Sequence, residues 1–415
     1  MDIRKKCMKI ICLLMIGLSG LTGCGSPSSD STENSQTAVV LAQDTEQKEN
    51  TGDNEGAEKD SAKSEYAGLQ YESSMELLYA ENFQVDYYKD GYVMLTTKMD
   101  DRQFLVVPKD QEVPDDLDSD VVILQRPIKD IYLVASGIMD AFCELDGLSA
   151  ISFSGQKQDG WYLEKARAAM ADGSIKYAGK YSKPDYEMLV ADGCSLAIEN
   201  RMISHSPEVV EKLNDFDIPV MIEYSSYESH PLGRVEWVRF FGALLGKEDV
   251  ADEIFQKQVE ILESMPKDTA DQEERPTVAF FFITSNGLVQ VRRTNDYVPK
   301  MIELAGGSYI FQDLTDEDTK RSTVNMQVEE FYNGAKDADY LIYNSSIDGG
   351  VQSLDELFAK CSLLKDFKAV QEGNVWCTTN DMYQQSLSVG YMMEDIYAML
   401  NGGAEEDMHY LFKIR

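Results

Sequence analysis

The sequence predicts an α/β protein with two Rossmann-like lobes, which have parallel-sheet cores, are joined by a single long α-helix and leave a cleft between them. Two observations lead to this prediction. Short apolar strands alternate with amphipathic helices from residue 121 to residue 400, and strict alternation is typical of parallel sheets covered by helices. One helix predicted over Glu248–Met265 is stopped by Pro266, and its length of about 27 Å could span two domains.

The N-terminus is predicted to be a cleaved lipoprotein signal peptide over residues 1–23. Met1–Lys9 is basic, Ile10–Leu21 is apolar, and Leu21–Cys24 ends the segment with small residues before a cysteine. This order is typical of export signals, and the apolar run is too short for a stable membrane-spanning helix. The ending resembles the bacterial lipobox, which implies acylation of Cys24 and membrane anchoring by lipid. The alternative is an ordinary signal peptide with an incidental cysteine.

Residues 24–65 are predicted to be a disordered acidic tether, because the polar composition of this segment offers little apolar surface to bury. The chain of 415 residues carries a formal net charge of −35. Nucleic-acid binding requires clustered lysine and arginine, so this charge argues against nucleic acid as a partner.

The start of the folded part is predicted to be a β-rich region over residues 66–110. Strands over Phe83–Tyr87 and Tyr92–Thr96 flank a Lys89–Gly91 turn, and Phe104–Val107 could add a third strand.

The N-terminal lobe, predicted over residues 66–245, continues with alternating elements. The predicted strands are Val121–Leu124, Leu148–Phe153, Ile175–Ala178, Ser195–Ile198 and Pro219–Tyr224. The predicted helices are Ile131–Leu145, Tyr162–Ala171, Tyr186–Ala191, Pro207–Phe216 and Arg234–Leu245.

The inter-lobe helix is assigned to residues 246–268 and the C-terminal lobe to residues 276–415. In this lobe, Asn286-Gly287 is a strong tight-turn signal. The predicted strands are Thr277–Thr284, Val289–Arg292, Tyr340–Tyr343 and Val375–Thr378. The predicted helices are Tyr297–Ala305, Val328–Ala338, Leu354–Cys361 and Tyr383–Leu400.

Cysteine and histidine usage bears on metal binding. Cys143, Cys194, Cys361 and Cys377 form no CxxC pair and are predicted to be buried free thiols. The chain has three histidines, too few for a typical direct zinc or manganese site. No metal site and no cofactor are therefore expected.

Several stretches between Val121 and Leu400 resemble the solute-binding proteins of iron-siderophore, haem and cobalamin ABC importers. These stretches are Lys183–Glu187, Pro219–Val220, His230–Arg234, Leu244–Glu248, Met301–Gly307, Glu329–Phe331 and Asp339–Ile342. The most specific stretch is Met301–Gly307, with its leucine-alanine-glycine-glycine helix end. The β-rich region lies outside the match.

The resemblance implies a function and partners. It implies a monomeric, extracytoplasmic protein, anchored to the cell membrane, that binds a small metal chelate and delivers it to an ABC permease and its ATPase. Glu187 and Glu329 match the glutamates that meet arginines of the permease, one on each lobe. The sequence does not choose among ferric siderophore, haem and cobalamin.

The cleft residues are expected in loops that leave the carboxyl ends of strands, where open α/β sheets bind ligands. Arginine offers forked donors to anionic oxygens, and aromatic faces pack on flat ligands. The candidates are Trp161, Arg201, Tyr224, Tyr227, His230, Arg292, Arg293, Tyr297, Trp376 and Tyr383.

Two other functions stay open. A lipid-anchored enzyme such as a glycosidase is one, although the sequence has no G-x-S-x-G, H-E-x-x-H or G-x-x-x-x-G-K motif. A surface sensor or scavenger that uses the same cleft without an importer is the other.

Overall fold

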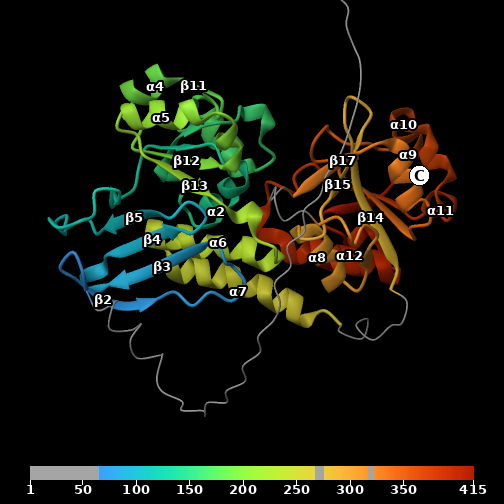
Figure 1. Cartoon of the computed structure of the whole chain (residues 1–415), viewed down its shortest axis with the longest axis horizontal. Coiled ribbons are helices and arrows are strands. Elements are labelled where there is room, and N and C mark those ends of the chain that lie inside the picture. Colours follow the sequence, from blue (N-terminus) through green and yellow to red (C-terminus); the bar gives the residue numbers. More distant parts are fainter. Residues whose placement is uncertain (1–64, 267–274, 316–321) are drawn as a thin grey trace, which may run out of the picture. The chain divides into compact units, whose positions relative to one another are not determined.

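The computed structural model describes residues 65–266, 275–315 and 322–415 (Figure 1). The predicted signal peptide, Cys24 and all of the predicted tether except Glu65 lie outside these ranges. Glu65 itself begins a strand that pairs with Leu69–Ser74, so the tether prediction is wrong at this residue. Within the described ranges, no helix combines the length and apolar character that a bilayer crossing requires.

Six of the described strands form an N-terminal sheet in chain order. Its neighbours are antiparallel except for the last pair, which is parallel. The predicted hairpin around Lys89–Gly91 is confirmed, and Asp90 and Gly91 take the positive φ angles that the tight turn requires. The strands are β1 (Glu65–Tyr66), β2 (Leu69–Ser74), β3 (Phe83–Tyr88), β4 (Val93–Thr97), β5 (Arg102–Val107) and β6 (Val122–Gln125).

The strand predicted over Val121–Leu124 exists as β6, but it was expected to open the first parallel sheet. It pairs with β5 instead, Phe104 opposite Val122, and so completes the N-terminal sheet. An apolar run predicts a strand but does not indicate which strand it pairs with. For this reason the sequence assigned β6 to the wrong sheet.

The first lobe contains a fully parallel sheet in the order β13-β12-β7-β8-β9. The predicted alternation of strands and helices is confirmed here, apart from the first helix. The strands are β7 (Ile131–Leu133), β8 (Ile151–Ser154), β9 (Lys176–Tyr177), β12 (Leu196–Asn200) and β13 (Val220–Glu223), with a small β10 (Gly179–Lys180) and β11 (Lys183–Pro184) hairpin. The helices are α2 (Met139–Glu144), α3 (Glu164–Ala171), α4 (Tyr186–Ala191), α5 (Pro207–Asp215) and α6 (Pro231–Leu245).

The helix predicted over Ile131–Leu145 is wrong in its first half. Ile131–Leu133 is the strand β7, paired on both sides by β12 and β8, and only Met139–Glu144 is α-helical. All three residues of β7 are buried. A strand that is buried on both faces is a continuous apolar run. Periodicity alone does not distinguish such a run from the first turn of a buried helix.

The second lobe contains seven of the described strands, in the order β17-β15-β14-β18-β19-β20 with β16 also on β14. Its centre is parallel as predicted, but β15, β17 and β20 run antiparallel. The predicted Asn286-Gly287 turn joins β14 to β15. The strands are β14 (Thr277–Ile283), β15 (Val289–Arg292), β16 (Ser308–Tyr309), β17 (Thr323–Met326), β18 (Tyr340–Tyr343), β19 (Val375–Thr378) and β20 (Leu411–Lys413). The helices are α8 (Tyr297–Leu304), α9 (Val328–Ala335), α10 (Leu354–Lys360), α11 (Lys368–Gln371) and α12 (Val389–Asn401).

The helix predicted from Tyr383 begins later, at Val389. Asp381 to Gln385 is a turn in which the backbone N–H groups of Gln384 and Gln385 both donate to the carbonyl of Asp381, and Ser386–Ser388 is a short 3-10 helix before α12. The Ser386 hydroxyl donates to the Gly137 carbonyl, and the Leu387 N–H donates to Asp140 at 3.0 Å. These contacts with the first lobe hold the segment out of the helix.

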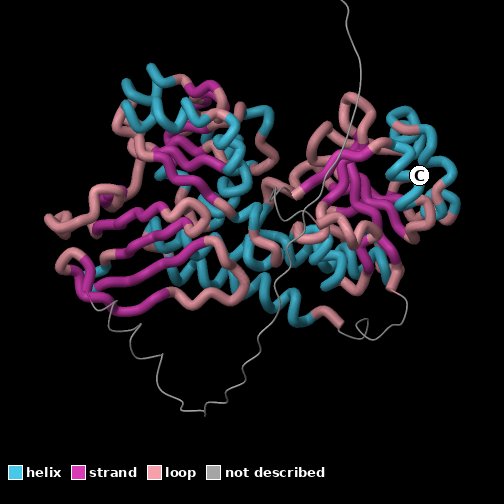
Figure 2. The backbone as a smooth tube through the Cα atoms, viewed as in Figure 1, coloured by secondary structure: helices cyan, strands magenta, loops and turns pink. Residues whose placement is uncertain are grey.

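The predicted connecting helix is confirmed as α7 (Glu248–Ser264), which contacts both α6 and α12 (Figures 1 and 2). One apolar cluster runs through this junction and includes Phe240 of α6, Phe255 of α7 and Met393 of α12. Burial of such a continuous cluster stabilises the junction between the lobes.

The four predicted free thiols are confirmed in the part of the chain that is described: Cys143, Cys194, Cys361 and Cys377 are buried and unpaired. Burial raises the pKa of Cys143 and of Cys377 to about 12 and that of Cys194 to about 11, so these thiols stay protonated near neutral pH.

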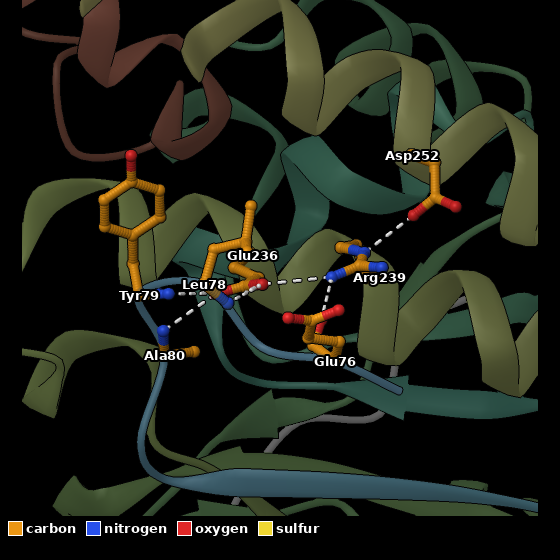
Figure 3. A network of polar contacts seen from close by, with 7 residues as sticks. All are labelled: Glu76, Leu78, Tyr79, Ala80, Glu236, Arg239 and Asp252. Atoms are coloured by element: carbon orange, nitrogen blue, oxygen red, sulfur yellow. Dashed lines mark hydrogen bonds and ion pairs between the residues drawn. The ribbon is translucent and has the colours of Figure 1, made fainter. Parts of the chain in front are cut away.

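A buried glutamate of α6 holds the N-terminal sheet against the first lobe (Figure 3). The Glu236 carboxylate accepts hydrogen bonds from the N–H groups of Leu78, Tyr79 and Ala80, each at 2.8 Å. Arg239 donates to Glu236 at 3.0 Å and to Asp252 of α7 at 2.6 Å, so the same network also reaches the connecting helix. Hydrogen bonds to a buried charge are stronger than neutral ones.

Another buried carboxyl, Glu199 on the central strand β12, has no hydrogen-bond partner among the described residues. Its side chain is fully buried, and burial raises its pKa to about 8. The folded protein therefore favours the protonated, neutral acid at neutral pH.

We expect Glu236→Ala to lower the free energy of unfolding by about 3–5 kcal/mol, because the substitution leaves three backbone N–H groups without their acceptor and removes one of the two carboxylates that Arg239 contacts. Urea denaturation followed by circular dichroism measures the change. Glu253→Ala is the matched control, since Glu253 lies exposed on α7. Equal stability of the two variants would show that the network does not anchor the sheet.

Glu199→Gln tests the buried acid. The folded-state pKa of about 8 lies above the ordinary 4.5, so the contribution of Glu199 to stability is fully present below pH 4.5 and is lost as the pH rises through 8. The glutamine variant should lack this decline and exceed the wild type by a few kcal/mol above pH 8, since one pKa unit equals about 1.4 kcal/mol. Parallel pH–stability curves for the two proteins would contradict the assignment.

Candidate ligand-binding cleft

A cleft of about 540 Å³ is lined by residues of both lobes. On the first lobe its wall comes from the loops that follow β7, β12 and β13 and from the start of α6. The second lobe contributes the end of β15, the start of α8 and the loop that precedes α12. Its first-lobe wall thus lies at the carboxyl ends of parallel strands, where α/β sheets bind ligands.

Three arginines in the cleft each lie over a tyrosine ring. The guanidinium carbon of Arg201 is 4.8 Å from the Tyr227 ring centre, within the first lobe. That of Arg292 is 5.3 Å from the Tyr383 ring centre, within the second lobe.

The third pair crosses between the lobes. The guanidinium carbon of Arg234, on α6, lies 3.9 Å from the centre of the Tyr297 ring, on α8. Stacking of this kind fixes the guanidinium plane and leaves its edge free to donate. Arg201 Nη1 and Arg234 Nε are buried and have no hydrogen-bond partner within the described ranges. Both residues line the cleft, so their guanidinium groups can offer donors to an anionic ligand there.

Arg292 is held by its neighbours. It forms an ion pair with Asp296 at 3.4 Å and contacts the Tyr383 hydroxyl. Asn344 donates to the same hydroxyl at 2.9 Å. Asp296 caps α8 by accepting from the Val298 N–H at 3.0 Å, so Arg292 is fixed relative to the helix start.

Two buried carboxyls lie in the described wall, Glu223 and Asp296, and burial raises the pKa of both while a nearby arginine opposes the shift. Both have local structural partners. Glu223 accepts from the Ser225 N–H at 2.9 Å, and Asp296 caps α8. These roles explain both carboxyls without a catalytic pair.

Tyr383 belongs to a loop that ties the second lobe to the first. The neighbouring Gln384 side chain accepts from the Tyr162 N–H and donates to the Gly160 carbonyl, both at 2.8 Å. Together with the contacts of Ser386 and Leu387, this bridge forms a second connection between the lobes beside α7.

Half of the predicted cleft residues line the cleft. These are Arg201, Tyr227, Arg292, Tyr297 and Tyr383. Their contact with a ligand stays a prediction.

Three other predicted cleft residues are core residues outside the described wall. Trp161 is buried and its indole N–H donates to the Ser154 hydroxyl at 3.2 Å. Tyr224 is buried and packs edge-on against Tyr227, with ring centres 6.4 Å apart. Trp376 is buried in the interior strand β19. Large aromatic side chains near strand ends can fill a core as well as a cleft, and the sequence alone does not separate these uses.

The remaining two predicted residues also lie outside the described wall. His230 caps α6, accepting from the Leu232 N–H at 3.1 Å, and stacks on Tyr79 at 4.4 Å. Burial lowers the pKa of His230 to about 4, so it is neutral near pH 7. Arg293 follows Arg292 directly, and its backbone N–H donates to the Ser322 carbonyl at 3.0 Å.

Sequence reasoning did not place Arg234, Glu223 or Asp296 in the cleft. A signal existed for Arg234, because a cation near a helix N-terminus opposes the helix dipole and so calls for a reason. The polar wall residues that were also missed are Ser136, Asn200, Ser204, Ser225, Ser226 and Ser322. Such small polar residues are common in loops and gave no distinct signal.

The predicted docking glutamates are both exposed in the first turns of helices, Glu187 on α4 and Glu329 on α9. Asp185 caps α4 by accepting from the Met188 N–H. Within the described ranges, no three His, Cys, Asp or Glu side chains are clustered so that they could hold a metal ion.

No family model matches the sequence. Two uncharacterized lipoproteins of Methanocaldococcus jannaschii are similar to this chain. One is 25% identical, with 98% of this chain and 99% of the relative covered. The other is 26% identical, with 75% of this chain and 78% of the relative covered.

Several solved solute-binding proteins are similar in fold to this chain. A petrobactin-binding protein from Bacillus subtilis has a TM-score of 0.55 at 15% identity, covering 74% of this chain and 98% of that one. A periplasmic heme-binding protein from Pseudomonas aeruginosa has a TM-score of 0.55 at 12% identity, covering 69% and 98%. The predicted fold is confirmed: this chain has the two-lobed α/β architecture of periplasmic solute-binding proteins.

Proposed function

We propose that this protein is the extracytoplasmic solute-binding lipoprotein of an ABC importer, and that its ligand is a chelated metal, in the first place a ferric siderophore. The observation that carries the proposal is the cleft in which Arg201, Arg234 and Arg292 each stack on a tyrosine. Its volume of about 540 Å³ is within the usual range for small-molecule sites.

The donor chemistry favours an anionic, oxygen-rich ligand. Arginine forks bind carboxylate, catecholate or similar oxygens through charge-assisted hydrogen bonds. In a chelate the metal already has its ligands, so the protein needs no His, Asp or Glu cluster around it.

The residues that line the cleft favour a siderophore over haem and cobalamin. Haem and cobalamin present large flat macrocycles, which are best covered by apolar and aromatic walls. The described wall of this cleft has three tyrosines, but each lies under an arginine, and five serines and one asparagine also line it. These polar groups match the many oxygens of a siderophore. Haem and cobalamin are the alternatives within the same proposal.

Anchoring and delivery complete the proposal. We infer that lipid on Cys24 holds the protein at the membrane and that residues 24–64 act as its tether; the name lipoprotein given to the two relatives supports this. The folded part would comprise residues 65–245, the connection over residues 246–268 that contains α7 (Glu248–Ser264), and residues 276–415. Glu187 and Glu329 would meet arginines of the permease, which works with its ATPase. Bidentate pairs on both lobes would fix the orientation of docking.

We expect protein lacking residues 1–24 to bind a ferric tris-catecholate, and to bind haemin and cobalamin more weakly, in isothermal titration. Arg292→Gln should weaken binding of the tris-catecholate roughly tenfold or more, since a charge-assisted hydrogen bond contributes about 1.5–3 kcal/mol. Arg167→Gln, on the exposed face of α3, removes the same charge away from the cleft and should have no effect.

Absence of binding for every chelate in the panel, or an equal loss in both arginine variants, would contradict the proposed ligand class. Chemical turnover of a bound ligand would support the enzyme alternative instead.

Charge reversal tests delivery. Glu187→Lys combined with Glu329→Lys should leave chelate affinity unchanged, because both residues are exposed at helix starts, and should abolish uptake of the radiolabelled ferric chelate by cells. Glu253→Lys is the control, since Glu253 lies exposed on α7; Glu330, exposed beside Glu329, is the alternative docking residue on α9. Normal uptake by the double variant would favour a sensor or scavenger.

A further inference from the structure

The N-terminal sheet, β1 to β6, lies outside the stretches that resemble importer-binding proteins, yet it is tightly joined to the cleft-bearing lobe. The connection is the segment Leu78–Asn82, between β2 and β3. Five successive N–H groups of this segment donate to two carboxylates. Glu236 receives the first three, and Glu228 receives those of Glu81 and Asn82 at 2.9 and 3.0 Å.

Both carboxylates flank the start of α6. Glu228 precedes the helix and also accepts from the Trp237 indole N–H at 2.9 Å, while Glu236 lies on its second turn. The segment and the helix approach so closely that a Cβ on Gly233 would be 2.9 Å from the Tyr79 carbonyl oxygen. Only glycine permits this distance without displacement of the segment.

A ring contact completes the attachment. Tyr79 stacks on the imidazole of His230, with ring centres 4.4 Å apart and planes 23° apart. His230 is the N-cap of α6. The contacts of the segment therefore fall on residues 228, 230, 233 and 236, on both sides of Arg234.

Arg234 is the cleft arginine that crosses to Tyr297 of the other lobe. At its far end the guanidinium is held by the Tyr297 ring, and the buried carboxyls of Glu223 and Asp296 lie near enough to attract it. Its backbone position depends on where the first turn of α6 lies, and the segment Leu78–Asn82 contacts that turn on both sides of Arg234.

A second contact points the same way. The turn between β4 and β5 brings Asp100 near the hydroxyl of Tyr224, and burial together with this carboxylate raises the pKa of Tyr224. Tyr224 packs against Tyr227, the ring beneath the guanidinium of Arg201.

We infer that the N-terminal sheet is part of the ligand-binding machinery, and that Tyr79 is a positioning residue that acts through His230 and the first turn of α6 to hold Arg234 in the cleft. The inference rests on the proposed function in that it takes Arg234 as a donor to the ligand. The sheet thus serves the binding site directly and is more than a spacer between the tether and the lobes.

The test compares Tyr79→Leu with Tyr79→Phe, which keeps the ring. Tyr71→Leu is the matched control, because Tyr71 is a partly buried tyrosine of the same sheet that packs in a different cluster, around Tyr88. The first measurement needs no ligand. Phenylglyoxal modifies accessible arginines, and peptide mass spectrometry follows its rate at Arg234 and, as an internal reference, at Arg201.

We expect Tyr79→Leu to raise the modification rate at Arg234 about threefold or more and to leave the rate at Arg201 unchanged, because the substitution removes the ring that stacks on His230 at the start of α6. Tyr79→Phe and Tyr71→Leu should match the wild type. Affinity for the ferric tris-catecholate should fall several-fold in Tyr79→Leu alone.

An unchanged rate at Arg234 in Tyr79→Leu overturns the inference, as does an equal effect of Tyr71→Leu. A raised rate with unaltered chelate affinity overturns the role in binding. If the wild type binds no chelate but the rate at Arg234 still rises, the proposed function fails while the positioning of Arg234 by the sheet is supported.

Discussion

Buried carboxylates that accept runs of backbone N–H groups hold this protein together. Glu236 binds three successive N–H groups of the N-terminal segment. Asp395 of α12 does the same for His409, Tyr410 and Leu411, and so fixes β20 at the sheet edge. A buried charge without its donors is costly, so each site specifies one position for the segment that it binds. Helices thereby anchor strands that are remote in sequence.

The cleft follows from this arrangement. Fixed helices α6 and α8 carry Arg234 and Tyr297 toward each other, and the loop after β12 brings in Arg201. The acids in the described wall are engaged with backbone groups, so the arginines dominate what the cleft offers to a solute. A polar, cationic recess on an acidic protein is a local departure from the net charge of −35, and such departures indicate a binding site.

Much of the fold could be predicted from local patterns. The β3–β4 hairpin, α7 and most strand–helix alternation were visible because periodicity and turn residues report local structure. The partner of β6 and the strand identity of Ile131–Leu133 were not, because pairing and two-sided burial depend on distant residues. For the same reason Trp161 and Trp376 were indistinguishable from cleft aromatics, while the contribution of Arg234 required knowledge of how two helices meet.

The bridge formed by Gln384, together with α7, means that the two lobes are connected at more than one point. A binding protein constrained in this way loses little conformational entropy when a ligand binds, and its cleft has one preferred width. Selectivity between ligands would then lie mainly in their dissociation rates, because ligands of comparable charge would associate at similar rates. A solute that fits the cleft poorly would bind and dissociate quickly, whereas a solute that matches its shape and donors would dissociate slowly.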